Sequence, residues 1–528
     1  MAREPGQRYA STAELAHDLR AFLDGRVVRA WRSGPLAELA AWYRRHRATA
    51  ATALVAALAL VALATWFVLR LDQARDRAAE AARAAEASLR ELDELAVSER
   101  VDDLRRRGDD LWPLAPAQEP RLRAWLDEAA ALRPVRDALQ ARRAATRNDA
   151  DSPAPALAQR WRDRLLARTL QDLAVFLDSV PATPFADANQ GAVAARLELL
   201  VSLRRAAEGD ASRRWSQAAE DLRADGRFAG TRLRPQFDLL PLGRDPQSGL
   251  LEFAHLPSGV APTRDADGRL RLAPECGIVL VLLPGGTFAM GAQPDGPANQ
   301  DPAAEANESP VHTLTLAPFF LAKHEMTQAQ WLRTFGANPS NHDARSLFVD
   351  PARAPLHPVE NVTWYECRTH MRRLGLELPT EAQWEYAARC APAAAGGRDL
   401  AAPRANLSDR ARARALAAQC PAFEASLDDG FVMHAPVGSF AADAWGLHDL
   451  FGNVWEWCRD EYCSYEVAAR PGDGARPCDE KPQLAIYRGG AFDTLAVEAR
   501  AANRAGAPPD VRQFTVGVRP ARRLDESD

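Results

Sequence analysis

The chain has 528 residues, of which 47% are hydrophobic and 26% charged, and its formal net charge is -5. This length accommodates two or three domains, and the composition is typical of globular protein, which excludes bulk disorder. Arginine far outnumbers lysine, and acidic and basic residues are interspersed, so no nucleic-acid partner is predicted. All seven cysteines lie after residue 275, which would suit a C-terminal half in an oxidising compartment.

Residues 2–24 read AREPGQRYASTAELAHDLRAFLD and predict one short amphipathic helix. Ser11 and Glu14 form a capping box at its start. The stretch resembles the last helix of the C-lobe of bacterial transmembrane serine/threonine kinases, in which a Pro-x-x-Arg segment, here Pro5 to Arg8, precedes such a helix. We therefore interpret residues 1–25 as a kinase C-lobe remnant, followed by a basic juxtamembrane segment at 26–47.

The rest of a kinase is absent from this sequence. It contains no Gly-rich phosphate loop, no β3 lysine motif, no His-Arg-Asp catalytic loop and no Asp-Phe-Gly motif. Phosphoryl transfer needs all of these groups to hold nucleotide, metal and nucleophile. Either the reading frame begins inside a larger kinase or an ancestral catalytic part has been lost, and the sequence leaves both open.

A run without charged residues, Ala48 to Leu69, predicts a transmembrane helix. As a helix it spans roughly 33 Å, enough for the hydrocarbon core of a bilayer. The alternative is an Ala-rich buried helix, but soluble helices normally carry a polar stripe. Arginines precede the run, namely Arg26, Arg29, Arg32, Arg44, Arg45 and Arg47. This bias predicts a single-pass inner or plasma membrane protein with a cytoplasmic N-terminus and a periplasmic or extracellular C-terminal domain.

Residues 70–245 predict a mainly α-helical stalk region. Their Ala/Arg/Glu/Leu-rich beginning has oppositely charged residues four positions apart, and a break around Thr146 to Ala156 contains two prolines. Spacing or packing against the next domain is the favoured role, with a ligand-sensing helical domain as the alternative. Self-association through the stalk is also expected. Strand-type patterns begin near residue 248, so a domain boundary is predicted near 245, with the last domain at 246–528.

From Cys276 onward the pattern is α+β, with short strands, many turns and two helices that begin near Thr327 and Thr363. Seven motifs follow one another: GIVLVLLPGGTFAMG, SPVHTLTLAPFFLAKHEMTQAQW, HPVENVTWYEC, LELPTEAQWEYAAR, GLHDLFGNVWEWCRD, YRGGAFD and VGVRPAR. In order and spacing they resemble the formylglycine-generating enzyme (sulfatase-modifying factor) family. The resemblance implies that family's fold, a variant of the C-type lectin fold that is rich in loops.

The same resemblance implies two structural calcium sites. The first set consists of the side chains of Asp449 and Glu456 and the carbonyls of Gly452 and Val454. The second consists of Asn406, Leu407, Asp429 and Phe431. Carboxylate and carbonyl oxygens are the ligands that Ca²⁺ prefers, whereas the alternative for these residues is an ordinary polar turn.

The family's copper chemistry is not expected in this chain. Family enzymes oxidise a substrate cysteine to formylglycine with two cysteines just downstream of a Gly-Gly pair, because soft thiolates hold Cu(I). Here that stretch reads GGAFDTLAVEARAANRAG, and no cysteine follows Cys478. Ala491 also replaces the usual serine. No copper and no formylglycine formation are therefore predicted.

Two further possibilities concern metal and disulfides. The His-x-x-x-His-x-Glu motif of related non-haem iron sulfoxide synthases is absent, and the candidates for a metal pair are His312, His324, His357, His370, His434 and His448. A core histidine is the commoner outcome for such residues. The pairs Cys390 with Cys420, and Cys458 with Cys463 or Cys478, are candidate disulfides whose connectivity the sequence leaves open.

The function predicted from these observations is a ligand-binding or sensor module of a transmembrane serine/threonine kinase, without catalytic activity of its own. Its partners would be the lipid bilayer and an extracytoplasmic ligand, peptide or protein. By analogy with the family's substrate groove, the candidate ligand cleft consists of Trp455, Arg488, Asp493 and Arg504. The alternative is a divergent metal-dependent oxidase of the same superfamily.

Overall fold

The computed structural model describes residues 9–24, 26, 28, 35–148, 157–180, 183–389, 405–477 and 483–524. Several features discussed above therefore lie outside the described residues: Pro5 to Arg8, Arg29, Arg32, Pro153, Pro155, Cys390 and Cys478. The chain divides into two compact units, Met1–Leu95 and Ala96–Asp528.

The first unit is helical. Helix α1 (Thr12–Leu23) begins at the predicted cap, where the Glu14 N–H donates to the Ser11 hydroxyl at 3.2 Å, and α2 (Pro35–Arg45) follows. Helix α3 (Arg47–Asp109) contains the predicted apolar run. Its section Arg47–Glu86 is long and apolar enough to cross a membrane by length and composition, and none of its apolar window is buried inside the structure.

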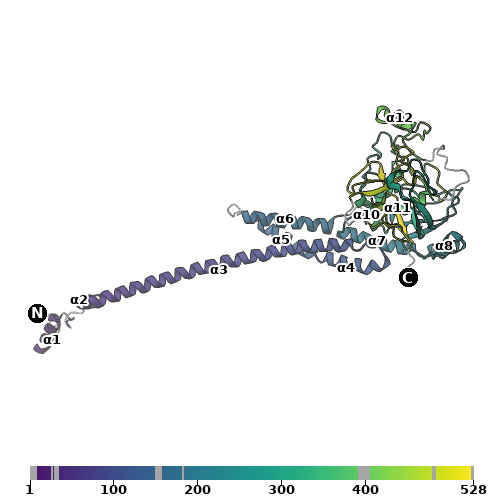
Figure 1. Ribbon diagram of the computed structural model, residues 1–528. Coiled ribbons are helices and arrows are strands. Elements are labelled where there is room, and N and C mark those ends of the chain that lie inside the picture. Colours follow the sequence, from purple (N-terminus) through teal and green to yellow (C-terminus); the bar gives the residue numbers. More distant parts are fainter. Residues whose placement is uncertain are drawn as a thin grey trace. The chain divides into compact units, whose positions relative to one another are not determined.

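The second unit starts with the end of α3 and continues into a group of helices on one side of the strands (Figure 1). These helices are α4 (Glu119–Ala130), α5 (Arg133–Asn148), α6 (Leu157–Asp178), α7 (Gln190–Ala206) and α8 (Asp210–Ala224). Trp112 stacks on Phe185 with ring centroids 5.2 Å apart, and Phe185 in turn contacts Phe335 of the C-terminal part at 6.2 Å. One hydrophobic core therefore includes both the helices and the strands.

Arg196 ties these helices together from inside. Its guanidinium is fully buried, donates to the carbonyls of Gly108, Pro184 and Ala186 at 2.6–3.0 Å, and lies 4.4 Å from the Trp112 ring. Burial lowers the pKa of Arg196 to about 10. From Ala96 on, the helices of the region predicted over 70–245 belong to the same compact unit as the C-terminal strands, which fits the expected packing against the next domain better than a free-standing stalk.

A five-stranded antiparallel sheet has the strand order β1-β2-β3-β6-β11. Its strands are β1 (Leu239–Arg244), β2 (Leu251–His255), β3 (Val279–Leu283), β6 (Phe319–Ala322) and β11 (Ala521–Arg523). The apolar runs of β3 and β6 are buried at every position, as central strands require. Because β1 lies before residue 246 and pairs with β2, this sheet begins earlier than the predicted domain boundary.

Two smaller sheets complete the C-terminal part. One has the order β10-β7-β8-β9, and the other pairs β4 with β5. Their strands are β4 (Gly286–Met290), β5 (His312–Leu316), β7 (Trp455–Glu461), β8 (Ala485–Arg488), β9 (Ala505–Ala507) and β10 (Val516–Gly517). The helices of this part are α9 (Gln328–Phe335), α10 (Trp364–Arg373), α11 (Glu381–Arg389) and α12 (Arg410–Leu416). The predicted starts at Thr327 and Thr363 are confirmed, each with a complete capping box.

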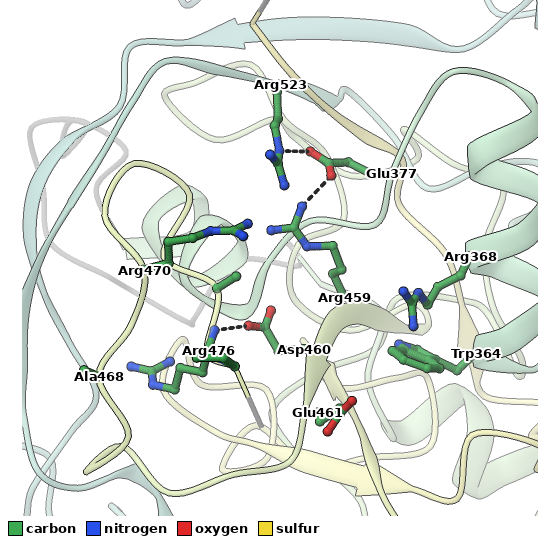
Figure 2. A pocket seen from close by; sticks show the side chains of 12 residues that line it. Trp364, Arg368, Glu377, Arg459, Asp460, Glu461, Ala468, Arg470, Arg476 and Arg523 are labelled. Carbon is green, nitrogen blue, oxygen red and sulfur yellow. Dashed lines mark hydrogen bonds and ion pairs between the residues drawn. The ribbon is translucent and has the colours of Figure 1, made fainter. Parts of the chain in front are cut away.

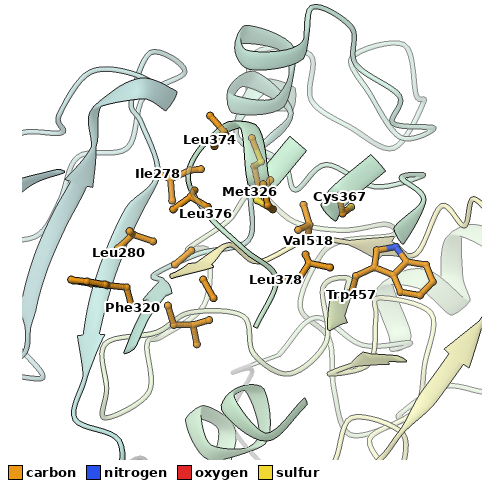
Figure 3. Close-up of a cluster of buried hydrophobic side chains, with 14 of the residues drawn as sticks. Ile278, Leu280, Phe320, Met326, Cys367, Leu374, Leu376, Leu378, Trp457 and Val518 are labelled. Carbon is orange, nitrogen blue, oxygen red and sulfur yellow. The ribbon is translucent and has the colours of Figure 1, made fainter. Parts of the chain in front are cut away.

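Figure 3 shows the core that these elements share. Side chains from β3, β6, α10 and β7 meet there, including Leu280, Phe320, Cys367 and Trp457. All four side chains are fully buried. The α+β prediction is therefore confirmed at the level of mixed helices and sheets, and much of the chain between the strands consists of turns, as the motifs indicated.

Candidate functional site

The segment that leads into β7 has an unusual backbone. Asp449, Gly452 and Asn453 have φ values of 59°, 77° and 60°, in the left-handed region. A Cβ on Gly452 would come within 2.1 Å of the Asn406 carbonyl oxygen, so only glycine fits there. The Asn453 N–H donates to the same carbonyl at 2.8 Å. The backbone thus brings the two predicted calcium segments, around 406 and around 452, into direct contact.

In the first predicted calcium set, Glu456 already has partners. Its carboxylate accepts hydrogen bonds from Arg519 Nε at 2.8 Å and from Trp384 Nε1 at 2.7 Å, and all three side chains are buried. Asp449 Oδ2 accepts from the Gly438 N–H at 2.7 Å, while its buried Oδ1 has no partner among the described residues. Within the described ranges, one carboxylate oxygen of this set therefore lacks a partner, and it belongs to Asp449.

Sequence reasoning missed a third carboxylate, Glu325, beside this turn. Its oxygens accept from Asn453 Nδ2 at 2.8 Å and from the Val454 N–H at 3.3 Å. Burial raises the pKa of Glu325 well above its usual range, and the nearby Asp449 carboxylate raises it further. No local signal in the HEMTQ motif indicated this role, because the partner lies more than a hundred residues away in the sequence.

The second predicted set retains two unsatisfied side-chain oxygens. Asn406 Oδ1 and Asp429 Oδ2 are buried and lack a hydrogen-bond partner within the described residues. Their other polar atoms are used, since Asn406 Nδ2 donates to the Met433 carbonyl at 2.9 Å and Asp429 Oδ1 accepts from the Phe431 N–H at 2.8 Å. Burial raises the pKa of Asp429 to about 7, with a contribution from Asp409. Two buried oxygen acceptors without donors fit a hard cation such as Ca²⁺.

Of the candidate histidines, His357 and His434 come together. Their Nδ1 atoms lie 2.8 Å apart, so one donates and the other accepts, and burial lowers both pKa values to about 3. His434 Nε2 lies 3.8 Å from Glu360. Over the described ranges, however, no group of three or more His, Cys, Asp or Glu side chains is placed to hold a metal ion. The pair therefore fits the interpretation of neutral core histidines.

The predicted ligand cleft does not open at its four residues. Arg488 and Arg504 are 0% and 4% exposed, and Trp455 is buried against Tyr487 with ring centroids 5.2 Å apart. Among the four, only Asp493 is exposed. The two guanidinium groups point into the domain, which corrects the expectation that they present themselves to a ligand.

Both arginines bind Glu381, the first residue of α11. Arg488 Nη1 and Arg504 Nε donate to Glu381 Oε1 at 2.8 and 2.6 Å, and Arg476 Nη1 lies 3.7 Å from Oε2. Burial raises the pKa of Glu381, but the surrounding arginines outweigh that effect and lower it. This carboxylate therefore stays ionised at the centre of three arginines, with the Tyr465 hydroxyl 3.3 Å away.

The loop after Gly489 and Gly490 packs two side chains against the second glycine. A Cβ on Gly490 would meet Ala499 Cβ at 2.9 Å and Thr494 Oγ1 at 3.0 Å. The Thr494 hydroxyl accepts from the Ala491 N–H and donates to the Ala491 carbonyl, both at 3.0 Å. The positions closest to the glycine pair thus carry a methyl group and a hydroxyl group that is already hydrogen-bonded.

The described cysteines do not form a thiol pair at this loop. Cys276, Cys367, Cys420 and Cys458 are free and buried, and Cys463 is in a disulfide. The candidate disulfides of Cys420 and of Cys458 are therefore wrong. Among the four described free cysteines, Cys420 is linked to the loop: its Sγ lies 3.4 Å from Ser408 Oγ, and the Ser408 N–H donates to the Thr494 carbonyl.

Comparison with known proteins agrees with the motifs. Residues 274–524 match the family model described as Sulfatase-modifying factor enzyme 1-like domain. The formylglycine-generating enzyme of Thermomonospora curvata is 29% identical, over 49% of this chain and 98% of that protein. The inactive C-alpha-formylglycine-generating enzyme 2 of Bos taurus is also 29% identical, over 46% of this chain and 86% of its own.

A second group of relatives is named for kinases. Serine/threonine-protein kinase pkn1 of Chlamydia caviae is 28% identical over 46% of this chain, and the match spans 38% of that relative's length. The similarity thus covers about half of this chain and less than half of that protein. The resemblance drawn from the motifs is confirmed: residues 274–524 form a sulfatase-modifying factor enzyme 1-like domain.

Proposed function

We propose that this chain is a membrane-anchored recognition protein whose sulfatase-modifying factor enzyme 1-like domain binds an extracytoplasmic peptide or protein without oxidising it. The observation that carries the proposal is the loop after Gly489 and Gly490. Thr494 and Ala499 pack against Gly490, and neither supplies the soft sulfur donor that Cu(I) requires. A domain that keeps the fold but lacks these donors is suited to binding.

The free thiols that the structure describes do not replace the missing pair. Burial raises the pKa values of Cys367 and Cys458 well above their usual range, so both thiols stay protonated. A protonated thiol is a poor metal ligand and a poor nucleophile. Cys420 offers one thiol near the loop, whereas the copper chemistry of the family uses two.

The relatives support a non-catalytic, signalling role. One similar protein is named an inactive formylglycine-generating enzyme, and others are named serine/threonine kinases. Together with the resemblance of residues 2–24 to a kinase C-lobe helix, these names favour a sensor module linked to a kinase. The competing proposal, a divergent metal-dependent oxidase, has weaker support. The Nδ1 atoms of His357 and His434 form a hydrogen bond with each other, so neither is available as a metal ligand.

We also propose that a structural calcium ion occupies the second set. Asn406 Oδ1 and Asp429 Oδ2 would bind it together with the carbonyls of Leu407 and Phe431. The ion would satisfy two buried oxygens that otherwise lack donors. It would stabilise the segment around Asn406 against the turn at Gly452, where little regular secondary structure is present.

The proposal that the domain is not an oxidase is tested with the full-length chain in detergent. We expect no aldehyde when it is incubated with a Cys-x-Pro-x-Arg peptide, copper and oxygen, because the sequence has no cysteine after Gly490 and the described cysteines form no thiol pair there. Mass spectrometry of the peptide gives the readout, and an active formylglycine-generating enzyme in the same mixture is the positive control. Formation of aldehyde that depends on this chain would contradict the proposal.

The calcium proposal predicts a specific loss in Asp429→Asn. Calcium at about 100 times its dissociation constant should stabilise the wild-type fold by about 2.7 kcal/mol relative to EDTA. The variant should lose most of that gain. Asp428→Asn is the matched control, because Asp428 is the exposed neighbour and pairs with Arg414 instead. A melting temperature that EDTA leaves unchanged in the wild type would show that no such ion is bound.

The pH dependence of the calcium effect gives a second readout for the same site. The folded pKa of Asp429 is about 7 and its usual value is 3.8, so without calcium the folded state holds a proton that the unfolded state has lost between these values. Stability from this group is therefore present below about pH 4 and lost as pH rises through about 7. Calcium must displace that proton, so its stabilising effect should weaken below pH 7 in the wild type.

Membrane anchoring is tested with alkaline phosphatase fusions after residues 40 and 100. The enzyme should be active only in the second fusion, because the arginines before the apolar run keep the N-terminus inside. Leu58→Arg with Val61→Arg should abolish that activity, since each charge at the centre of a span costs about 2.5–3.5 kcal/mol. Equal activity of the two unmodified fusions would rule out the proposed topology.

A further inference from the structure

A cavity of about 550 Å³ lies beside the strand β7, away from the loop after Gly490, and arginines dominate its wall (Figure 2). It is bounded by α10, the end of β7, the segment 468–477 and β11. Five arginines line it: Arg368, Arg459, Arg470, Arg476 and Arg523. Trp364, Ala468 and Pro477 add apolar surface to the same wall. Nothing in the sequence motifs singled out this place.

Three of these arginines share two carboxylates. Arg459 binds both Glu377 and Asp473, Arg523 lies 3.3 Å from Glu377 and 3.1 Å from Asp473, and Arg470 also binds Asp473. Burial works against ionisation of Asp473, but hydrogen bonds from arginines hold its pKa well below the usual range. The group therefore carries one more positive than negative charge, and the side chains of Arg470 and Arg523 are 55% and 56% exposed.

Arg368 adds a guanidinium that has no carboxylate partner in the part of the chain that the structure describes. It lies 4.4 Å from the centre of the Trp364 ring, and Trp364 is fixed by a hydrogen bond from its Nε1 to the Cys458 carbonyl at 2.7 Å. Stacking on an aromatic face orients an arginine while leaving its N–H groups available. Figure 2 shows Arg368 beside Trp364 at the edge of the cavity.

Two acidic residues, Asp460 and Glu461, also line the cavity. Asp460 is buried, and its oxygens accept from the backbone N–H groups of Glu381 and Arg476 at 2.7 and 3.0 Å. Burial raises the pKa of Asp460 to about 6, which works against its ionisation, while the two backbone donors already occupy its oxygens. Among the residues that line the cavity, five arginines therefore face three acidic residues, Glu377, Asp460 and Glu461.

Arg476 forms the floor and has an unsatisfied donor. It is 5% exposed, and its buried Nε has no hydrogen-bond partner within the described residues. Its terminal nitrogens contact the Met290 sulfur at 3.7 Å and His312 Nε2, and Nη1 also lies 3.7 Å from the buried Glu381 carboxylate. Within the described residues, Nε is therefore the donor of Arg476 that still lacks an acceptor.

We infer that this cavity binds a small ligand that carries an oxyanion, a phosphate or a carboxylate group. Planar guanidinium groups match both oxyanions with paired N–H donors, and the apolar part of the wall accommodates the rest of the ligand. The inference deepens the proposed recognition role by naming a class of ligand. It rests on that role in one respect, namely that the ligand is bound and not chemically converted. The site is separate from the loop at Gly490, so each can be tested alone.

The test is calorimetric titration of the full-length chain in detergent with inorganic phosphate and, separately, with citrate, at constant ionic strength. We expect saturable binding of at least one of them. Arg368→Gln together with Arg470→Gln should weaken that binding about tenfold or more, since two charge-assisted contacts are lost. This pair should leave the fold intact because Asp473 keeps Arg459 and Arg523.

The matched control is Arg213→Gln on α8, an arginine that is 82% exposed and paired with Asp210. It should bind as the wild type does. Absence of saturable binding of both anions, or equal binding by the double variant with an unchanged melting temperature, would overturn the inference. Aldehyde formation with intact anion binding would instead overturn only the proposed recognition function.

Discussion

The C-terminal domain depends on one buried carboxylate. Glu381 binds Arg488, which immediately precedes Gly489, and Arg504, which follows the loop after the glycine pair. Both ends of that loop are therefore fixed to the same side chain. Removal of one partner from a buried charge group typically costs about 3–5 kcal/mol, because the remaining charges lose their compensation. Here the loss of Glu381 would remove the shared carboxylate partner of three buried arginines, Arg476, Arg488 and Arg504.

This arrangement explains why the expected ligand cleft is closed. To bind a ligand, an arginine needs N–H groups that reach solvent. Arg488 and Arg504 instead donate hydrogen bonds to Glu381 and to the backbone carbonyls of Ala501 and Asn307. Arg476 is the third arginine beside Glu381, and it also lines the arginine-rich cavity. The ionic network thus separates a closed loop from an accessible, positively charged cavity.

Local sequence signals predicted local structure well. The caps at Ser11, Thr327 and Thr363 were correct because a helix start depends on residues within one turn. The apolar run within α3 was equally readable, since its length and composition are sufficient. The C-terminal motifs identified the domain type, although the C-type-lectin-like fold and the calcium ions stay predictions.

Contacts between residues that are far apart in the sequence could not be predicted in this way. Nothing near Arg196 in the sequence indicates that it meets Trp112 and the distant Gly108 carbonyl, so the contacts that join the helices from Ala96 on could not be predicted. The wrong disulfides have the same cause, because Cys420 and Cys458 are placed by the packing of separate segments. Glu456 matched a calcium motif, but its pairing with Arg519 depends on a residue 63 positions away.

If the domain is a recognition module, its fold does not hold copper at the glycine pair. The most direct test of this is the copper content of the full-length chain after loading with Cu(I) under reducing conditions and dialysis against a chelator. We expect copper to be removed to the level of a Cys420→Ser variant treated in the same way. One copper ion retained per chain, and lost in that variant, would contradict it.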